Sequence, residues 1–243
     1  MALIEFLEWD STFFERKIGR VSVRSENEFA PFQFINEAKN SFDLVYVFSF
    51  QEMLSHKTIT LANLALVDIM LTMRMTFNKS KYLAGAFDFR NTLSGVELAA
   101  CYGIAEQTAI VSRFYKEPLI GPEKTKALYR KWIDNALNKT HSDGIFVLKK
   151  NGIIEGIHII RTDIPKKEGC CTLIGVGKDM RNIGIGKRLW ESAYSYWSKY
   201  FDIDRVVVPF SMQNLGSLNF HLKMGFDRIT EVKYIYHYRN RNR

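Results

Sequence analysis

The stretch of chain from residue 177 to residue 187 combines glycines and basic residues in a way that suits an anion. A predicted strand over 170–176 leads into Gly177-Lys178-Asp179-Met180 and then Arg181-Asn182-Ile183-Gly184-Ile185-Gly186-Lys187. Glycine lets the backbone approach a ligand closely, and the first turn of a helix leaves N–H groups free at a positive dipole end. These features predict a pyrophosphate cradle, although a G-x-G at a strand-to-helix turn is also ordinary turn chemistry.

A second group of polar residues lies further along the chain, at helical spacing. Asn214, Ser217 and His221 are three and four residues apart, so they share one face of a helix. The neighbouring face carries leucines, which we expect to form the core contact: Leu215, Leu218 and Leu222. A polar stripe that ends in a titratable group beside a phosphate cradle suggests the wall of an active site.

Composition restricts the classes of function that remain. The chain has 243 residues, of which 47% are hydrophobic and 25% charged, as in an ordinary globular protein. Its net charge of +8 is compatible with a phosphate-bearing small molecule and equally with no specific ligand, and we find no basic stripe of the kind that nucleic-acid binding needs.

The sequence gives no sign of export, membrane insertion or metal binding. Residues 1–10 lack the basic flank of a signal peptide, and polar residues interrupt the longest apolar run, 61–75. Three cysteines match no disulfide framework or metal spacing. We expect a cytoplasmic protein without a metal site.

Two parts with different patterns follow each other along the chain, 1–110 and 111–243. In the first part, Asp10 or Ser11 is expected to cap a short helix. The other elements predicted there are strands over 3–7, 18–24, 44–50 and 61–77, a helix over 29–39 and a mixed connector over 79–91.

The second part alternates helices and strands. Asn151-Gly152 is a strong hairpin signal between two predicted strands. The elements predicted in this part are helices over 122–138, 184–200 and 214–224, with strands over 144–150, 153–162, 170–176, 205–210 and 228–238. This order predicts an α/β (α+β) fold with a mixed central sheet and helices on both faces, preceded by a smaller mixed α/β domain.

With these motifs the chain resembles the GNAT superfamily of acyl-CoA N-acyltransferases. Residues 181–186 match the family's R/Q-x-x-G-x-G/A motif, and Asn214, Ser217 and Gly225-Phe226 match a second signature. The resemblance covers residues 111–243 and implies a GNAT fold with acetyl-CoA or another short-chain acyl-CoA as co-substrate. It also implies that Gly175 marks a strand bulge that admits the thioester. The coenzyme contacts that it implies are Ile174, Val176, Arg181, Asn182, Ile183, Gly184, Ile185, Gly186, Lys187, Asn214 and Ser217.

One position departs from the family pattern. Many members carry a tyrosine four residues before the Gly-Phe, where it protonates the leaving thiolate, and this chain carries His221 there. An imidazole can donate a proton near neutral pH, so the resemblance leaves His221 as the catalytic acid or as a buried helix residue. Glu155 and His158, on the strand over 153–162, are candidates for a base that receives the proton of the acceptor amine, and positioning alone is the alternative.

The N-terminus carries a further resemblance, to bacterial nucleotide-sugar N-acyltransferases of the same superfamily. Residues 7–19 match L-x-W-D-S-x-F-F-x-x-x-I-G, and residues 112–114 and 236–238 are typical of dTDP-fucosamine (dTDP-4-amino-4,6-dideoxygalactose) N-acetyltransferases. This similarity implies a dTDP-linked amino-dideoxy sugar as the acceptor. The substrate contacts that it leaves as candidates are Trp9, Asp10, Phe13 and Arg113, beside core or salt-bridge roles for the same residues.

Two other functions stay open at this point. The acceptor could be a protein or amino-acid amine, or the chain could bind CoA as a sensor without catalysis. In each case we expect small-molecule ligands, no nucleic acid and no membrane, and the sequence leaves a homodimer open.

Overall fold

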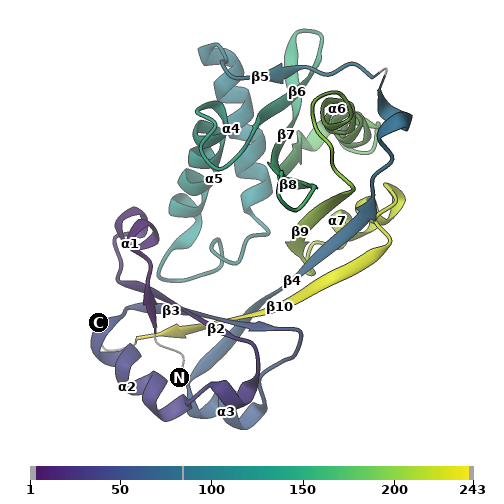
Figure 1. Cartoon of the computed structure of the whole chain (residues 1–243). Helices are drawn as coiled ribbons and strands as arrows, with labels where there is room; N and C mark the ends of the chain where they lie inside the picture. The colour runs from purple at the N-terminus through teal and green to yellow at the C-terminus, as the bar shows by residue number, and fades with distance from the viewer. Residues whose placement is uncertain (1–3, 84, 241–243) are drawn as a thin grey trace.

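A single mixed sheet of ten strands runs through the computed structural model, which describes residues 4–83 and 85–240 (Figure 1). The strand order is β1-β2-β3-β10-β4-β9-β8-β7-β6-β5. The β2–β3 and β8–β9 pairs are parallel and the others antiparallel. The strands are β1 (Glu5–Phe6), β2 (Ile18–Val23), β3 (Leu44–Phe50), β4 (Leu64–Thr76), β5 (Phe89–Arg90), β6 (Gly144–Lys150), β7 (Ile153–Asp163), β8 (Glu168–Val176), β9 (Arg205–Ser211) and β10 (Arg228–Arg239).

Seven α-helices cover this sheet within the described residues. They are α1 (Glu8–Phe14), α2 (Pro31–Ser41), α3 (His56–Leu61), α4 (Gly95–Ala109), α5 (Gly121–Leu137), α6 (Ile185–Tyr200) and α7 (Leu215–Lys223). Helices α4 and α5 pack on one face of the β6–β8 region, and α6 packs on the opposite face. The predicted fold, a mixed sheet with helices on both faces, is confirmed.

The two long strands β4 and β10 extend from one end of the molecule to the other (Figure 1). One end holds β1–β3 with α1–α3, and the other holds β5–β9 with α4–α7. The buried side chains form three clusters, one beneath α4 and α5, one beneath α6 and one between β3 and α2. The long strands therefore connect the hydrophobic cores at the two ends.

The proposed division of the chain at residue 110 stays a prediction. Helix α4, which precedes that boundary, packs on β7 and β8. Strand β10, which follows it, pairs with β3 and β4. The hydrogen-bonded sheet thus continues across the sequence boundary.

Local structure differs from the sequence expectation at three places. Helix α1 begins at Glu8, and no side chain caps it, so the predicted capping role of Asp10 or Ser11 is wrong. The Ser11 hydroxyl instead accepts the Ile18 N–H (3.0 Å) at the start of β2. Helices α3 and α4 were not expected, although a Ser94–Glu97 capping box begins α4.

The described residues contain no helix long and apolar enough to cross a membrane. Among them, no group of three or more histidine, cysteine, aspartate or glutamate side chains could hold a metal ion. Cys101, Cys170 and Cys171 are all buried and unbridged.

Candidate active site

Strands β8 and β9 are paired at one end only. Their parallel hydrogen bonds join Glu168–Cys170 to Arg205–Val207 and go no further, although both strands continue. On their other sides β8 stays paired with β7, and β9 with β4. The strands therefore separate after Cys170, and the edge of β8 from Cys171 to Val176 keeps backbone N–H and C=O groups free of β9.

The bulge of β8 lies within this separation, at a different residue from the one expected. The β7–β8 register shifts between Ile159 and Ile160, where Thr172 is the extra residue of β8. Gly175 pairs regularly with Ile157, and a Cβ there would lie 2.8 Å from the Ile104 side chain. Gly175 therefore allows α4 to approach the sheet, and the predicted bulge at this residue is wrong.

A cavity of about 230 Å³ occupies the gap between the two strands. Its walls come from β8 and β9, from α7 and from the segment that follows α4. Side chains of the sequence-predicted residues Ile174, Asn214, Ser217, His221 and Arg113 line it, together with Asp68 of β4. The fold thus brings the predicted coenzyme strand, the polar stripe and one predicted substrate residue to a single cavity.

The predicted phosphate cradle adjoins the start of α6. Gly184 is the N-cap residue with φ +90°, and no side chain caps the helix. Because the first-turn amides of a helix have no partner within it, the N–H groups of Ile185, Gly186 and Lys187 point outward without a capping oxygen. No protein atom of the described residues lies within 4 Å of a Cβ built on Gly184, so the space in front of it is open.

Gly186 has a different role from the one the sequence suggested. A Cβ at this position would lie 3.1 Å from the ring of Phe220 on α7. The absence of a side chain therefore lets α6 and α7 approach each other, and the open space in front of the loop lies at Gly184. Arg181 also folds back, donating its Nε–H to the Val176 carbonyl (3.2 Å), while Asn182 adopts φ +63° and Ile183 is exposed.

Helix α7 presents its polar stripe to the interior. The Asn214 side chain caps the helix by accepting the Ser217 N–H (3.0 Å), and His221 is 1% exposed. The leucines expected to form the core contact lie elsewhere: Leu215 is 63% and Leu222 50% exposed. Leu218 is partly buried and packs against the core as predicted. The prediction was wrong for Leu215 and Leu222, because the rings of Phe210, Phe226 and Trp190 enclose His221 instead.

The surroundings of His221 do not suit an imidazolium acid. Burial lowers its pKa to about 4, so the ring is neutral at neutral pH. Its Nδ1 lies 2.8 Å from the Ser217 carbonyl oxygen, which only accepts hydrogen bonds, so the Nδ1 atom carries the hydrogen. The other nitrogen, Nε2, is then an acceptor, and it has no partner among the described residues.

The two predicted base candidates lie outside the cavity. His158 is fully buried on the α6 side of β7, where its Nδ1 lies 3.3 Å from the Leu189 carbonyl and its ring contacts Trp190. Burial lowers the pKa of His158 to about 3. Glu155 lies at the end of β7, next to Gly177, near the phosphate loop. The structure therefore contradicts a substrate contact by His158, and Glu155 is not among the residues that line the cavity between β8 and β9.

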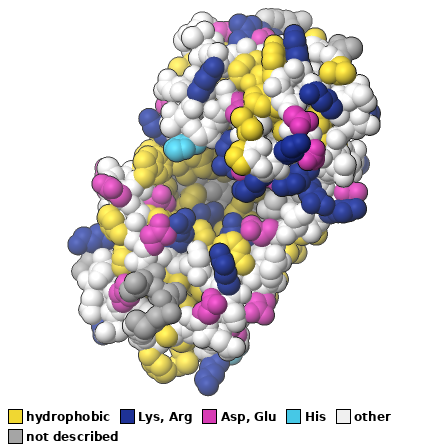
Figure 2. Space-filling view, viewed as in Figure 1, with side chains coloured by type: hydrophobic (Ala, Val, Ile, Leu, Met, Phe, Trp, Pro, Cys, Tyr) yellow, Lys and Arg dark blue, Asp and Glu magenta, His cyan; other side chains and the backbone are white. Residues whose placement is uncertain are grey.

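Residues of the N-terminal motif gather near Arg113. Burial raises the pKa of Asp10, and the nearby Arg113 and Tyr46 side chains partly oppose this rise. The Arg113 guanidinium carbon lies 4.1 Å from the centroid of the Phe114 ring. Trp9 is 48% exposed and stacks on Phe13 with ring centroids 4.8 Å apart. Figure 2 shows a hollow in this face of the molecule, with basic and hydrophobic side chains inside it.

Sequence reasoning missed a buried charge network and a buried carboxylate in this region. Glu117, fully buried, accepts hydrogen bonds from Arg239 (2.8 Å) and His237 (2.5 Å) and so ties the segment after α4 to β10. Asp68 is 5% exposed and lines the cavity. The one available signal was an aspartate flanked by the apolar residues Val67 and Ile69.

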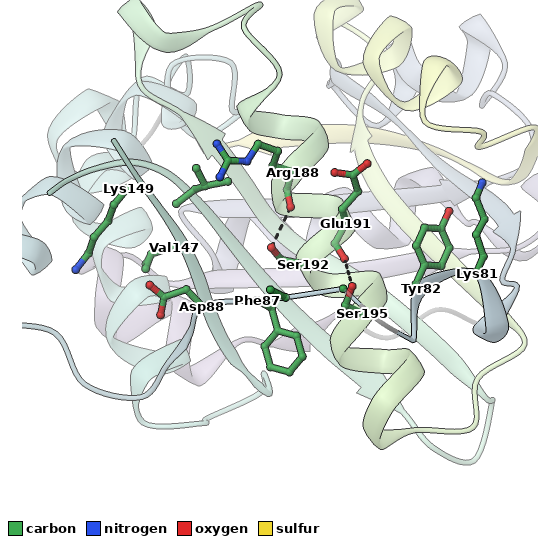
Figure 3. A pocket seen from close by; sticks show the side chains of 13 residues that line it. Lys81, Tyr82, Phe87, Asp88, Val147, Lys149, Arg188, Glu191, Ser192 and Ser195 are labelled. Carbon is green, nitrogen blue, oxygen red and sulfur yellow. Dashed lines mark hydrogen bonds between the residues drawn. The ribbon is translucent and has the colours of Figure 1, made fainter. Parts of the chain in front are cut away.

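A second, larger cavity of about 810 Å³ lies beside α6, between the segment over 81–88 and β6 (Figure 3). It contains none of the sequence-predicted site residues. Lys149 in its wall is paired with Glu97 (2.5 Å), and Asp88 is paired with Arg90. The Ser192 and Ser195 hydroxyls donate to carbonyl groups of their own helix. Its polar side chains are largely occupied by the protein itself.

Comparison with solved structures identifies the same fold. A functionally unknown conserved protein from Staphylococcus epidermidis ATCC 12228 matches with TM-score 0.66 and 14% identity over 98% of this chain and 91% of that chain. A GCN5-related N-acetyltransferase from Kribbella flavida matches with TM-score 0.55 and 12% identity over 98% and 88%. One from Sphaerobacter thermophilus matches with TM-score 0.52 and 14% identity over 82% and 61%.

The sequence comparisons address the family directly. A search of curated proteins gave no match. Residues 108–226 match the Acetyltransferase (GNAT) family, and this range includes the strand gap, the start of α6 and the polar stripe of α7. Residues 108–226, just under half of the chain, therefore match an acetyltransferase domain of the GNAT family, and acyl-CoA is the co-substrate that such a domain takes.

Proposed function

We propose that this protein transfers a short acyl group from acyl-CoA to the amine of a dTDP-linked amino-dideoxy sugar. The observation that carries the acyl-transfer part is the gap between β8 and β9, which leaves one strand edge free and encloses a cavity. The uncapped start of α6 offers amides for a diphosphate, and the free β8 edge offers backbone groups for an amide-bearing pantetheine arm. The chain's own groups thus fit both polar parts of the coenzyme.

The chemistry assigned to the chain in this proposal is direct transfer. The neutral acceptor amine attacks the thioester carbon, a C–N bond forms, and collapse of the adduct breaks the C–S bond. His221 accepts the proton of the adduct nitrogen at its unpartnered Nε2 and passes it to the leaving sulfur. The ring is neutral at the start and becomes the proton donor to sulfur only after it has taken the proton of the nitrogen, so the expected donor role is kept and the resting protonation state is changed.

The sugar part of the proposal is supported by the N-terminal motif and by where its residues lie. Asp10 and Arg113, from separate motif segments, lie near each other, and Arg113 also lines the cavity. The exposed Trp9–Phe13 pair on α1 presents a flat aromatic surface of the kind on which a nucleotide base or sugar ring can stack. Residues of the N-terminal motif therefore lie next to the cavity between β8 and β9, where a nucleotide-sugar acceptor would have to bind.

The proposal is tested by turnover and by binding. Acetyl-CoA and dTDP-4-amino-4,6-dideoxygalactose are incubated with the protein, free thiol is followed, and the amide product is identified by mass. We expect thiol release that depends on the amino sugar. Thiol release with protein or amino-acid amines but with no dTDP-amino sugar would contradict the acceptor, and calorimetry that detects no CoA binding would contradict acyl transfer. CoA binding without any turnover would indicate a sensor.

A further inference from the structure

Asp68 is a buried carboxylate in the acyl-transfer cavity that the reaction scheme above does not use. It lies on β4, which runs beside β9, and lines the same cavity as His221 and Arg113. The β4–β10 register shifts directly next to it, between Asp68 and Leu66. A bulge of this kind changes the direction of a side chain relative to the rest of its strand, and here it accompanies the one acidic residue of the cavity wall.

Asp68 forms no close ion pair, although the charge of Arg113 acts on it from beyond contact distance. It is 5% exposed, and within the described residues no lysine, arginine or histidine nitrogen lies within 4 Å of it. Its Oδ1 accepts one hydrogen bond, from Ser211 Oγ (2.6 Å), and its Oδ2 has none from that part of the chain. A buried carboxylate with one hydrogen bond and no contact ion pair is costly, so a cationic ligand group at this position would be favoured.

Arg113, which interacts electrostatically with Asp68 and Asp10, likewise forms no close ion pair. Its Nε is buried and has no hydrogen-bond partner among residues 4–83 and 85–240, and no carboxylate in those ranges lies within 4 Å of it. Asp68 and Arg113 both line the cavity without forming a salt bridge with each other. Two opposite charges that line one cavity without touching each other are complementary to a ligand that carries an ammonium and an anionic group.

We propose that Asp68 binds the ammonium group of the acceptor and takes its first proton, while Arg113 binds an anionic group of the same molecule. The transfer converts the ammonium and the carboxylate into a free amine and a carboxylic acid, and the carboxylic acid returns the proton to solvent after turnover. The free amine then has the lone pair that attack on the thioester requires. This inference rests on the proposed acyl transfer and names the class of acceptor: an amine that also bears a phosphate or carboxylate, as a nucleotide amino sugar does.

The test compares Asp68→Asn with the wild type, because asparagine keeps the size of the side chain and an acceptor for Ser211. The matched control is Asp202→Asn, whose carboxylate is 75% exposed in a surface pair with Lys167. Two ligands are titrated in the presence of CoA: dTDP-4-amino-4,6-dideoxygalactose and its hydroxyl counterpart, dTDP-6-deoxygalactose. The wild type should bind the amino sugar about 10- to 100-fold more tightly, and Asp68→Asn should abolish this preference.

Turnover and thermal unfolding complete the experiment. Asp68→Asn should lower kcat/KM for the amino sugar by about 100-fold or more while the Kd of CoA stays unchanged. Without ligands it should raise Tm by about 2–4 °C, because an unpaired buried charge is removed. A retained amine preference, or a lower Tm than the wild type, would overturn the assignment of Asp68. If the wild-type protein neither binds nor acylates the amino sugar, the proposed acceptor is refuted. The Tm of Asp68→Asn then tests separately whether the Asp68 carboxylate lacks a partner in the protein.

Discussion

The burial of His221 should make the free energy of unfolding depend on pH by an amount that can be calculated. Its pKa is lowered from 6.5 to about 4 in the folded protein. Between these two values the unfolded chain binds a proton that the folded chain does not, so the free energy of unfolding falls as the pH falls. From pH 7 to pH 4.5 this one side chain should remove about 2 kcal/mol of stability. His158, with its pKa lowered to about 3, should remove a similar amount.

The substitution His221→Phe isolates this contribution. Phenylalanine fits among the rings of Phe210, Phe226 and Trp190 and does not titrate. Urea unfolding followed by tryptophan fluorescence at pH 7 and pH 4.5 should show that the variant loses about 2 kcal/mol less than the wild type over this interval. Leu222→Phe, at a half-exposed position of the same helix, is the control and should keep the wild-type pH dependence. An equal loss in His221→Phe and wild type would refute the neutral, Nδ1-protonated ring, and with it the role of Nε2 as proton acceptor.

Three further expectations follow from the geometry. Gly184→Val should weaken CoA binding by about 10-fold or more in calorimetry, because a branched residue resists φ +90° at the start of α6. The control is Gly152→Val in the β6–β7 turn, which carries the same strain at φ +80° and should leave the Kd of CoA unchanged. Glu117→Gln should lower the free energy of unfolding by about 3 kcal/mol in urea titrations, since it breaks a buried network with His237 and Arg239, and a loss no larger than that of Asp202→Asn would contradict this account. Trp9→Ala should change stability by less than about 0.5 kcal/mol while raising KM for the nucleotide sugar, and unchanged kinetics would remove α1 from the acceptor site.

Much of the fold followed from local signals. Alternating and helical periodicities gave the strands and helices of residues 111–243 to within a few residues, because hydrophobic spacing is set by which face of each element is buried. Helix α4 was missed although Ser94 and Glu97 form a capping box, since its sequence has no clear polar face. The loop at the start of α6 was visible because a glycine with positive φ and an uncapped helix start are local properties.

The tertiary structure decided the rest. Local sequence could not show that β8 and β9 separate after Cys170, since that depends on which strands pair on either side. It placed Leu215 and Leu222 of α7 wrongly in the core, because the surrounding aromatic rings enclose His221 and leave these two leucines exposed. It also could not place Asp68 beside Arg113, since these side chains come from a strand and a loop that meet only when the long sheet forms. Residue types and spacing thus indicated the GNAT resemblance and the glycine loop at the start of α6, whereas contacts between distant segments bring the two charges of the cavity together.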